Sequence, residues 1–269
     1  MEIRRRIQRL LAEDDRSPDE RARLGELMLL LAGLPPPPDP VGLFPRCGEL
    51  REVFLAAVSG TDFEALEEAF LALYCHLHGH EAPYTAVERR RVDETGGYWS
   101  HAGGLSPVLK APPFIHDDTV LGDFGAGNGL QGLLIQKLRP HRLTVQIEIS
   151  SRMVEAGRAL AQWLSVPGER IRWIVGDVLD HEPEGMDFVY LYRPVRPEGE
   201  GRRFYERFAA ALARSAPRPV VIFSVADCLA GFLGPGFTAF HADGHLTCWR
   251  RTGDRGPASS PDGRPVVCS

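Results

Sequence analysis

The stretch VLGDFGAGNGLQGLLIQKL, from Val120 to Leu138, decides the fold of this chain. An apolar run ends at Asp123, five glycines fall between positions 122 and 132, and a segment with helical spacing follows. Glycines at a strand-to-helix turn let the backbone adopt positive φ and approach a ligand closely, and the helix N-terminus offers free N–H groups. The stretch therefore predicts a nucleotide-like ligand at this junction.

Two cofactor frames fit the same glycines. Gly127, Gly129 and Gly132 spell GxGxxG, the dinucleotide fingerprint. Asp123, Gly125, Gly127 and Gly129 spell a second pattern, DxGxGxG. GxGxxG alone is a weak signal, so features elsewhere in the chain are needed to decide between the GxGxxG and DxGxGxG patterns.

Apolar strands alternate with helices from about residue 119, which predicts a parallel sheet covered on both faces. We expect strands near 119–124, 143–148, 171–176, 187–192 and 219–224, and helices near 128–138, 151–164, 201–214 and 225–233. The segment GFTAFHADGHLTCWRR then reads as two strands joined by ADG, with no helix between them. An antiparallel hairpin is therefore expected to close the sheet.

Residues 1–95 are expected to be all-helical. SPDE at 17–20 is a capping box with proline at the first helical position, and TDFE at 61–64 repeats the pattern. We predict a helical N-terminal region at 1–95 that lids the pocket or shapes the substrate site. A cofactor-binding domain follows at 96–252, and the polar tail at 253–269 is expected to be disordered.

The DxGxGxG frame resembles motif I of the class I S-adenosylmethionine-dependent methyltransferases. In that family an acidic residue ends the second strand, and Glu148 in LTVQIEIS stands there, although it would serve a dinucleotide equally well. A GD pair follows the third strand in the family, and Gly176 and Asp177 in IRWIVGDV match it. The closing hairpin resembles the family's sixth and seventh strands, with the seventh inserted between the fifth and sixth. The resemblance covers about residues 96–250.

This resemblance implies an α/β fold with three layers: a Rossmann-like, mostly parallel seven-stranded sheet closed by the antiparallel C-terminal hairpin. It also implies S-adenosylmethionine as the cofactor. Asp123 would face the methionine amino group, Glu148 the ribose hydroxyls, and Asp177 the adenine amine. The full implied cofactor set is Asp123, Gly125, Gly127, Glu148, Ile149, Asp177 and Val178.

The acceptor side is expected at the end of the fourth strand and before the first. MDFVYLYRP ends in Tyr192, Arg193 and Pro194, where this family often places substrate-contacting or catalytic groups. It departs from the (N/D)PP(Y/F) signature of amino-group methylation on bases or glutamine, which disfavours those substrates. Arg193 suits a substrate carboxylate or phosphate, the alternative being a structural salt bridge.

The glycine-rich segment Thr95–Phe114 precedes the first strand, a place where many members of the family fold back over the cofactor. Tyr98 and Trp99 are therefore expected to contact the substrate. His101 is a candidate general base because an unperturbed histidine titrates near ~6.5. The alternative for His101 is a surface or packing role.

Composition narrows the partners and the compartment. A formal net charge of −5 lacks the basic signature of nucleic-acid binding, so a nucleic-acid acceptor is not expected. Five widely spaced cysteines form no CxxC, which predicts reduced thiols and a cytoplasmic protein without a membrane span. CHLHGH and HADGHLTC have spacings able to hold zinc, but neither is a standard zinc pattern, and no metal is expected.

The leading hypothesis is methyl transfer to an oxygen or nitrogen of a small-molecule acceptor, with a protein acceptor as the alternative. Two rivals stay open. One is a non-catalytic module that binds S-adenosylmethionine or S-adenosylhomocysteine, and the other is an NAD-dependent oxidoreductase that uses the GxGxxG frame. The sequence leaves the oligomeric state undetermined.

Overall fold

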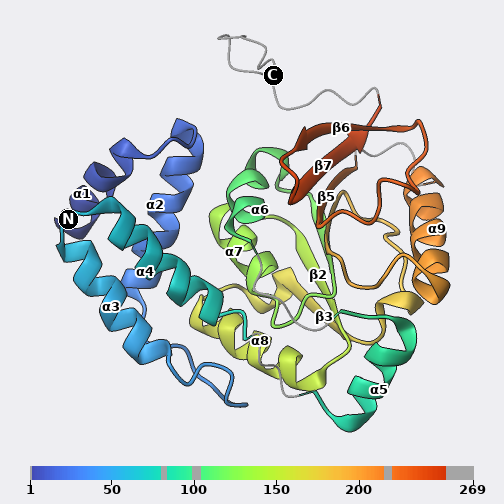
Figure 1. Ribbon diagram of the computed structural model, residues 1–269, viewed down its shortest axis with the longest axis horizontal. Helices are drawn as coiled ribbons and strands as arrows, with labels where there is room; N and C mark the ends of the chain where they lie inside the picture. The colour runs from blue at the N-terminus through green and yellow to red at the C-terminus, as the bar shows by residue number, and fades with distance from the viewer. Residues whose placement is uncertain (1, 80–83, 99–103, 215–219, 253–269) are drawn as a thin grey trace.

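A seven-stranded sheet runs through the centre of the molecule (Figure 1). The computed structural model describes residues 2–79, 84–98, 104–214 and 220–252. Within them the strand order is β3-β2-β1-β4-β5-β7-β6. The strands are β1 (Val120–Phe124), β2 (Leu143–Glu148), β3 (Ile171–Val175), β4 (Phe188–Tyr192), β5 (Val221–Val225), β6 (Phe237–Ala242) and β7 (Leu246–Arg251).

The first five strands are parallel, with β1 between β2 and β4. All five residues of β1 are buried, as expected for a strand covered on both faces. The strand order reverses between β1 and β4, and ligands of open α/β sheets bind beyond the carboxyl ends of the strands at such a point. The fold therefore places a site where the glycine-rich loop leaves β1.

The C-terminal hairpin inserts β7 antiparallel between β5 and β6. Its turn is set by Asp243, whose carboxylate accepts hydrogen bonds from the amides of His245 and Leu246 at 3.0 and 2.8 Å. Gly244 takes a φ of +82° in the same turn. The predicted fold is confirmed, because this order is that of the Rossmann-like methyltransferases and differs from the 3-2-1-4-5-6 order of dinucleotide-binding domains.

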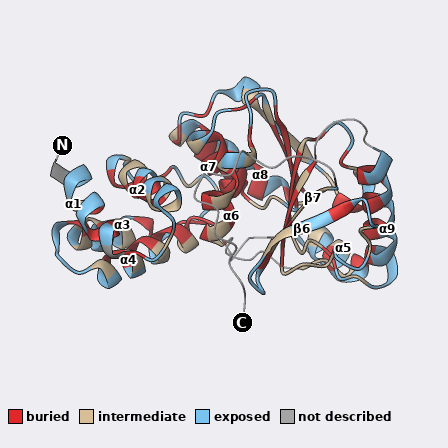
Figure 2. Cartoon of the chain, turned by 90° about the horizontal axis from the view of Figure 1, so that it is seen from above, coloured by how far each residue is buried: buried red, intermediate tan, exposed pale blue. Residues whose placement is uncertain are grey.

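Helices cover both faces of the sheet (Figures 1 and 2). One face carries α6 (Leu105–Lys110), α7 (Leu130–Leu138) and α8 (Ser151–Trp163), and the other carries α9 (Gly199–Arg214) with α5 (Ala86–Thr95) beside it. Among the residues that the structure describes, no helix is both long and apolar enough to cross a membrane.

The N-terminal helices form a lobe outside α6 and α7. They are α1 (Glu2–Leu10), α2 (Pro18–Gly33), α3 (Cys47–Ser59) and α4 (Phe63–His76). The capping box predicted for α2 is present, since the Ser17 side chain accepts from the Glu20 amide and the Glu20 side chain accepts from the Ser17 amide. Such a cap stabilises a helix by about 1 kcal/mol.

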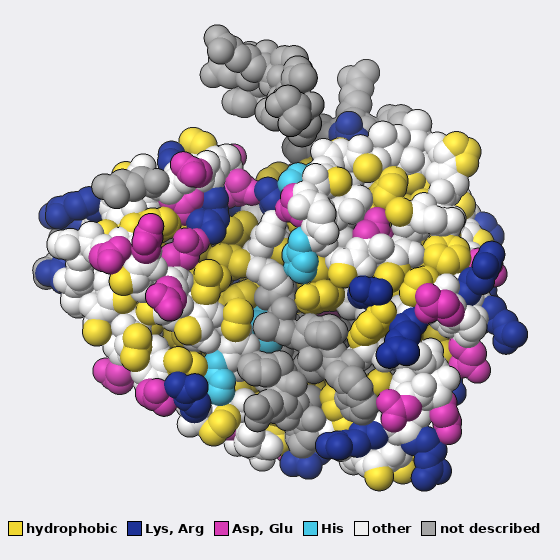
Figure 3. All heavy atoms as spheres, viewed as in Figure 1, with side chains coloured by type: hydrophobic (Ala, Val, Ile, Leu, Met, Phe, Trp, Pro, Cys, Tyr) yellow, Lys and Arg dark blue, Asp and Glu magenta, His cyan; other side chains and the backbone are white. Residues whose placement is uncertain are grey.

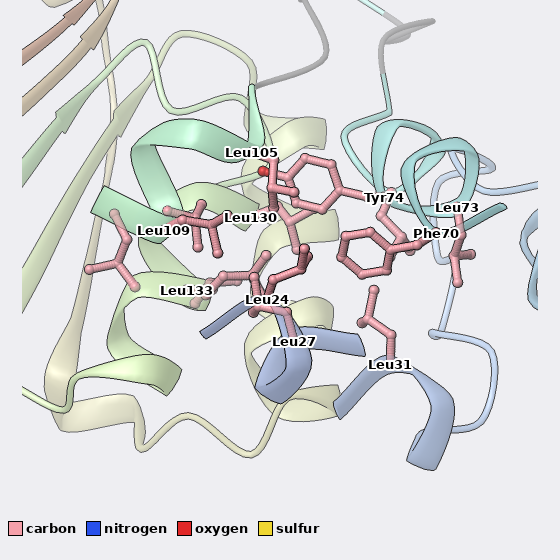
Figure 4. Packing of buried hydrophobic residues seen from close by; sticks show 14 of the residues in the cluster. Leu24, Leu27, Leu31, Phe70, Leu73, Tyr74, Leu105, Leu109, Leu130 and Leu133 are labelled. Atoms are coloured by element: carbon pink, nitrogen blue, oxygen red, sulfur yellow. The ribbon is translucent and has the colours of Figure 1, made fainter. Parts of the chain in front are cut away.

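One apolar core joins this lobe to the sheet domain (Figure 4). Figure 4 shows leucines of α2 packing against aromatic residues of α4 and against leucines of α6 and α7. Each fully buried side chain of this kind contributes roughly 1.5–3 kcal/mol relative to an exposed one. The helical lobe and the sheet domain therefore stabilise each other.

Two local predictions are wrong. The helix predicted at 225–233 is absent: Val225 ends β5, and the following residues form turns and loop, because the Asp227 carboxylate accepts from the Leu229 amide at 2.8 Å and from the Ser224 hydroxyl at 2.6 Å. Ala226 also has a φ of +48°, which no helix allows. The cap of α4 is Asp62, which accepts from the amides of Glu64 and Ala65, and the Thr61–Glu64 capping box is absent from this described segment.

Helices α5 and α6 were not predicted as separate elements. The strand predicted at 219–224 begins in the described residues at Val221. The tail at 253–269, predicted to be disordered, lies outside the described residues.

Candidate cofactor and acceptor site

The loop between β1 and α7 turns over the edge of the sheet with three glycines in the left-handed region. The φ angles are +79° at Gly125, +58° at Gly127 and +68° at Gly129. The amides of Gly125 and Ala126 both donate to the carbonyl of Ile147 in β2, at 3.0 and 2.9 Å. Glycine fits this path because it takes positive φ at little cost. The backbone thus lies along the wall of the site.

Close packing holds this loop against β2 and α8. A Cβ on Gly129 would lie 2.1 Å from Gln146 Oε1 in β2. A Cβ on Gly157 in α8 would lie 2.6 Å from the carbonyl oxygen of Asn128 in the loop. Neither position has room for a side chain, so the loop is fixed in place by its neighbours.

Asp123 is buried near the carboxyl end of β1. It is 1% exposed, and neither carboxylate oxygen has a hydrogen-bond partner among the described residues. Burial, reinforced by the nearby charge of Glu148, raises the pKa of Asp123 to about 8. A buried carboxyl group without partners is costly, so this position suits a donor that a ligand would bring.

Glu148 ends β2 with one backbone donor on each carboxylate oxygen. Oε2 accepts from the Gly127 amide at 2.8 Å, and Oε1 accepts from the Ser150 amide at 2.9 Å. Burial raises the pKa of Glu148, and these hydrogen bonds oppose the rise. Because each carboxylate oxygen has about two acceptor positions, Glu148 retains capacity for further hydroxyl donors.

Asp177 lies at the end of β3 and is already in an ion pair. Its Oδ2 accepts from the Nε of Arg91 on α5 at 2.6 Å, and its Oδ1 accepts from the Leu179 amide at 2.9 Å. The predicted contact between Asp177 and an adenine amine must therefore share an oxygen with one of these donors or displace Arg91. That contact stays a prediction.

The end of β4 supplies an aromatic and cationic wall. Tyr190 and Tyr192 lie two residues apart and so point to the same face of the sheet, and Tyr190 pairs in register with Asp123. Burial raises the pKa of Tyr192, whose ring meets the His245 ring edge-on at a centroid distance of 5.9 Å.

These groups face one cavity beyond the carboxyl ends of β1, β2 and β4. Its volume is about 890 Å³ with the open solvent at its mouth included. It brings together all the predicted cofactor residues and, on the acceptor side, Tyr98, Tyr192 and Arg193. Trp99 and His101 lie outside the described residues.

The sequence interpretation missed several residues at this cavity. His78, Tyr84, Gln131 and Tyr190 line it, and Arg91 reaches Asp177 from α5. Tyr190 had a detectable signal, because it alternates with Tyr192 on one strand. The others carry no local signal, since residues far apart in the chain bring them to the cavity.

The two histidine clusters have other contacts. His76 Nε2 accepts from the Arg46 amide at 3.2 Å, and His241 Nε2 lies 3.1 Å from Asp243 Oδ2. Within the described residues, no group of three or more His, Cys, Asp or Glu side chains is arranged to hold a metal ion. His80 of the first cluster lies outside those residues.

No protein-family model matches the sequence, and comparison with curated proteins finds no match. Among solved structures, the chain is similar to an RNA methyltransferase from Salinibacter ruber in complex with S-adenosyl-L-homocysteine, with 18% identity and a TM-score of 0.39 over 68% of this chain and 98% of that one. It is also similar to TrmN from Thermus thermophilus, with 19% identity and a TM-score of 0.41 over 54% of this chain and 47% of that one. A third is a SAM-dependent methyltransferase from Thiobacillus denitrificans in complex with S-adenosyl-L-homocysteine, with 17% identity and a TM-score of 0.35 over 45% and 48%. The chain thus spans about half the length of the last two; the strand order, and not these similarities, identifies the fold.

Proposed function

We propose that this chain is an S-adenosylmethionine-dependent methyltransferase that acts on an oxygen or nitrogen of its acceptor. The observation that carries the proposal is the buried carboxyl group of Asp123, which has no partner in the described chain and faces the cavity. An ammonium group is the donor that such a carboxylate binds best. The methionine amino group would supply it, directly or through water.

The neighbouring residues fit the rest of the same cofactor. Glu148 would accept from the two ribose hydroxyls with its remaining acceptor positions. The backbone of Gly125 and Gly127 would lie along the methionine part, and Ile149 and Val178 would contact the adenine. Asp177 would accept from the adenine amine.

The charge of the site disfavours the NAD alternative. None of the described lysines or arginines forms an ion pair with Asp123 or Glu148. Asp123, when ionised, would repel an anionic pyrophosphate and attract a cationic group, whereas Glu148 would serve either cofactor. The antiparallel β7 also separates this sheet from the dinucleotide-binding order.

When bound, S-adenosylmethionine supplies a methyl group on a sulfonium sulfur, which an acceptor atom attacks in line. The task of the chain is to orient that atom, and orientation alone supplies much of the acceleration in such reactions. Tyr98, Tyr192 and Arg193 would line the acceptor's position. Burial raises the pKa of Tyr192, so its hydroxyl would donate a hydrogen bond instead of acting as a base at neutral pH. His101 stays a candidate base.

The helical region 1–95 would shape the acceptor side of the cavity. Among its described residues, His78, Tyr84, Val92 and Thr95 line that cavity. A small-molecule acceptor is our leading proposal, and a protein acceptor is the alternative. Acidic and basic side chains interleave over the face shown in Figure 3.

Calorimetric titration of the full chain with S-adenosylmethionine and with NAD separates the cofactor classes. We expect S-adenosylmethionine to bind and NAD to give no heat; binding of NAD alone would overturn the proposal. Transfer of a radiolabelled methyl group to pools of small molecules, proteins and RNA then separates an enzyme from a binding module. Binding without transfer to any pool would favour the module.

A further inference from the structure

An arginine in a strained backbone conformation stands at the acceptor side of the cavity. Arg193 directly follows β4 and has a φ of +37°, and the other described non-glycine residues with positive φ are Ser165 and Ala226. Such conformations are costly for residues with a Cβ, and they concentrate at binding and catalytic sites. The fold therefore holds Arg193 in a position that its own backbone preference opposes.

Backbone pairing between the segment before β1 and the segment after β4 brings the Tyr98 ring to Arg193. Gly97 forms an antiparallel bridge with Val195. The Tyr98 amide donates to the Pro194 carbonyl at 3.2 Å, and the Arg196 amide donates to the Gly96 carbonyl at 2.8 Å. The segment before β1 is thereby tied to the segment after β4, which places the Tyr98 ring against the arginines.

Two guanidinium groups share that ring. The Cζ atom of Arg193 lies 4.6 Å from the centroid of the Tyr98 ring, and the Cζ of Arg196 lies 5.7 Å from it. A cation over an aromatic face is attracted by the ring's negative face, which orients the guanidinium plane. Arg193 is half-buried and lines the cavity, whereas Arg196 is exposed.

The charge of Arg193 has no counter-charge in the described chain. Its Nε is buried without a hydrogen-bond partner, and neither Arg193 nor Arg196 forms an ion pair with a described carboxylate. Two acidic residues of neighbouring segments, Asp227 and Glu200, have other partners. Asp227 accepts from Ser224, Leu229 and Trp249, and Glu200 lies 4.0 Å from Arg91. This leaves Arg193 without the structural salt bridge that was the alternative to a ligand-binding role.

The cavity is therefore polarised. The Asp123 carboxyl group, without a hydrogen-bond partner among the described residues, lies near the end of β1, and Glu148, without a cationic partner, ends β2. Arg193, which forms no ion pair in the described chain, follows β4, the strand on the other side of β1. The first side suits a cation, and the second suits an anion. A buried charge is costly unless it is paired, so each side would be stabilised by a ligand group of opposite charge.

We propose that Arg193, supported by Tyr98 and with Arg196 over the same ring, binds an anionic group of the methyl acceptor, either a carboxylate or a phosphate. The assignment to the acceptor rests on the proposed methyltransferase function. A planar guanidinium donates two parallel hydrogen bonds to either oxyanion, so this fork orients the acceptor as well as attracting it. The acceptor thus presents a carboxylate or a phosphate to Arg193, with its nucleophilic oxygen or nitrogen held toward β1.

The test titrates the full chain with sodium phosphate and with sodium acetate at constant ionic strength, and measures the dissociation constant of each from the shift in thermal unfolding. We compare wild type with Arg193→Gln, which removes the charge, and with Arg193→Lys, which keeps the charge and loses the fork. Arg203→Gln is the matched control, because Arg203 is exposed on α9. A single unfolding transition without probe verifies that each variant is folded.

We expect wild type and Arg203→Gln to bind at least one probe, Arg193→Gln to bind it at least ~10-fold more weakly, and Arg193→Lys to lie between them. The tighter probe identifies the acceptor as a phosphate or a carboxylate. Wild type that binds neither probe overturns the proposal, and so does Arg193→Gln that binds as wild type does. If Arg193→Gln does not fold, Arg193→Lys serves as the test, and equal binding by Arg193→Lys and wild type would overturn the proposal that Arg193 donates two parallel hydrogen bonds to the anion. Anion binding at Arg193 in a chain that does not bind S-adenosylmethionine would refute the proposed function and leave the anion site standing.

Discussion

Asp123 and Glu148 lie near the carboxyl ends of neighbouring parallel strands, and both carboxyl groups are buried, at 1% and 4% exposure. The charge of Glu148 helps raise the pKa of Asp123, so the two are electrostatically coupled. A fold tolerates such a pair at a free-energy cost, which a cationic ligand relieves on binding. The pair is therefore the feature of this structure that most favours a cationic cofactor.

The stability of the chain should fall as the pH rises from about 4, near the pKa of an unfolded aspartate, to about 8 because of Asp123. Its folded-state pKa of about 8 exceeds that of an unfolded aspartate, near ~3.9. The folded state then holds the proton more tightly, so this stabilisation is complete below the unfolded pKa and is lost as pH rises through about 8. Thermal unfolding should show a steeper loss in wild type than in Asp123→Asn. Parallel curves would show that Asp123 titrates normally.

Glu148→Gln should weaken S-adenosylmethionine binding by more than ~10-fold, the scale of a lost hydrogen bond to a charged group. The substitution also places an amide against the backbone donors of Gly127 and Ser150. Glu155→Gln, on the exposed side of α8, is the control and should bind as wild type does. Calorimetry measures both, and unchanged affinity in Glu148→Gln would remove this residue from the site.

Arg91→Gln should loosen α5 without unfolding the chain. The side chain of Arg91 is 41% exposed in its pair with Asp177, and α5 buries only Val92 and Thr95 among its described residues. A partly exposed pair is worth about 1 kcal/mol or less, so the midpoint of unfolding should change little. Amide hydrogen exchange across 86–95 should nevertheless become faster. Arg202→Gln, which removes the exposed pair with Glu206 on α9, should leave exchange in α5 unchanged. Equal exchange in wild type and Arg91→Gln would show that the pair does not hold α5.

Gly157→Ala should destabilise the chain by roughly 1–3 kcal/mol, as overpacking in a dense core does. The added methyl would lie 2.6 Å from the Asn128 carbonyl oxygen and 2.2 Å from the Trp173 ring. Because Asn128 belongs to the glycine-rich loop, cofactor affinity should fall as well. Gly168→Ala, where a Cβ meets nothing within 4 Å, is the control for denaturant unfolding. Equal stabilities of the two variants would contradict the close packing of α8 on the loop.

Much of the sheet was predictable from the sequence because its strands are short apolar runs that end at glycine or acidic residues. Asp123, Glu148 and Asp177 were found at the ends of β1, β2 and β3 by their place in that rhythm, and the structure places all three at one cavity. The predicted helix at 225–233 does not form, because hydrogen bonds to the Asp227 carboxylate outweigh the local apolar pattern. One of these donors, Trp249, lies far along the chain and could not be foreseen from the local sequence.

The other omissions have a tertiary cause. Arg91 and His78 reach the cavity from the helical region, and no local periodicity marks a residue whose partner lies far along the chain. The conformation of Arg193 was also beyond the sequence, because no local pattern predicts a positive φ at an arginine, here two residues before the bridge between Gly97 and Val195. Sequence reasoning therefore identified the chemistry of the cofactor side better than that of the acceptor side.

The affinity of Asp123→Asn for S-adenosylmethionine tests the central proposal most directly. Asparagine keeps the shape of the side chain and removes the charge that would bind the ammonium group. Calorimetry at pH 8 should show binding by wild type and by Asp118→Asn, an exposed control, and binding by Asp123→Asn weaker by ~10-fold or more. Equal affinities in all three chains, or no binding by wild type, would contradict a cofactor site built on Asp123.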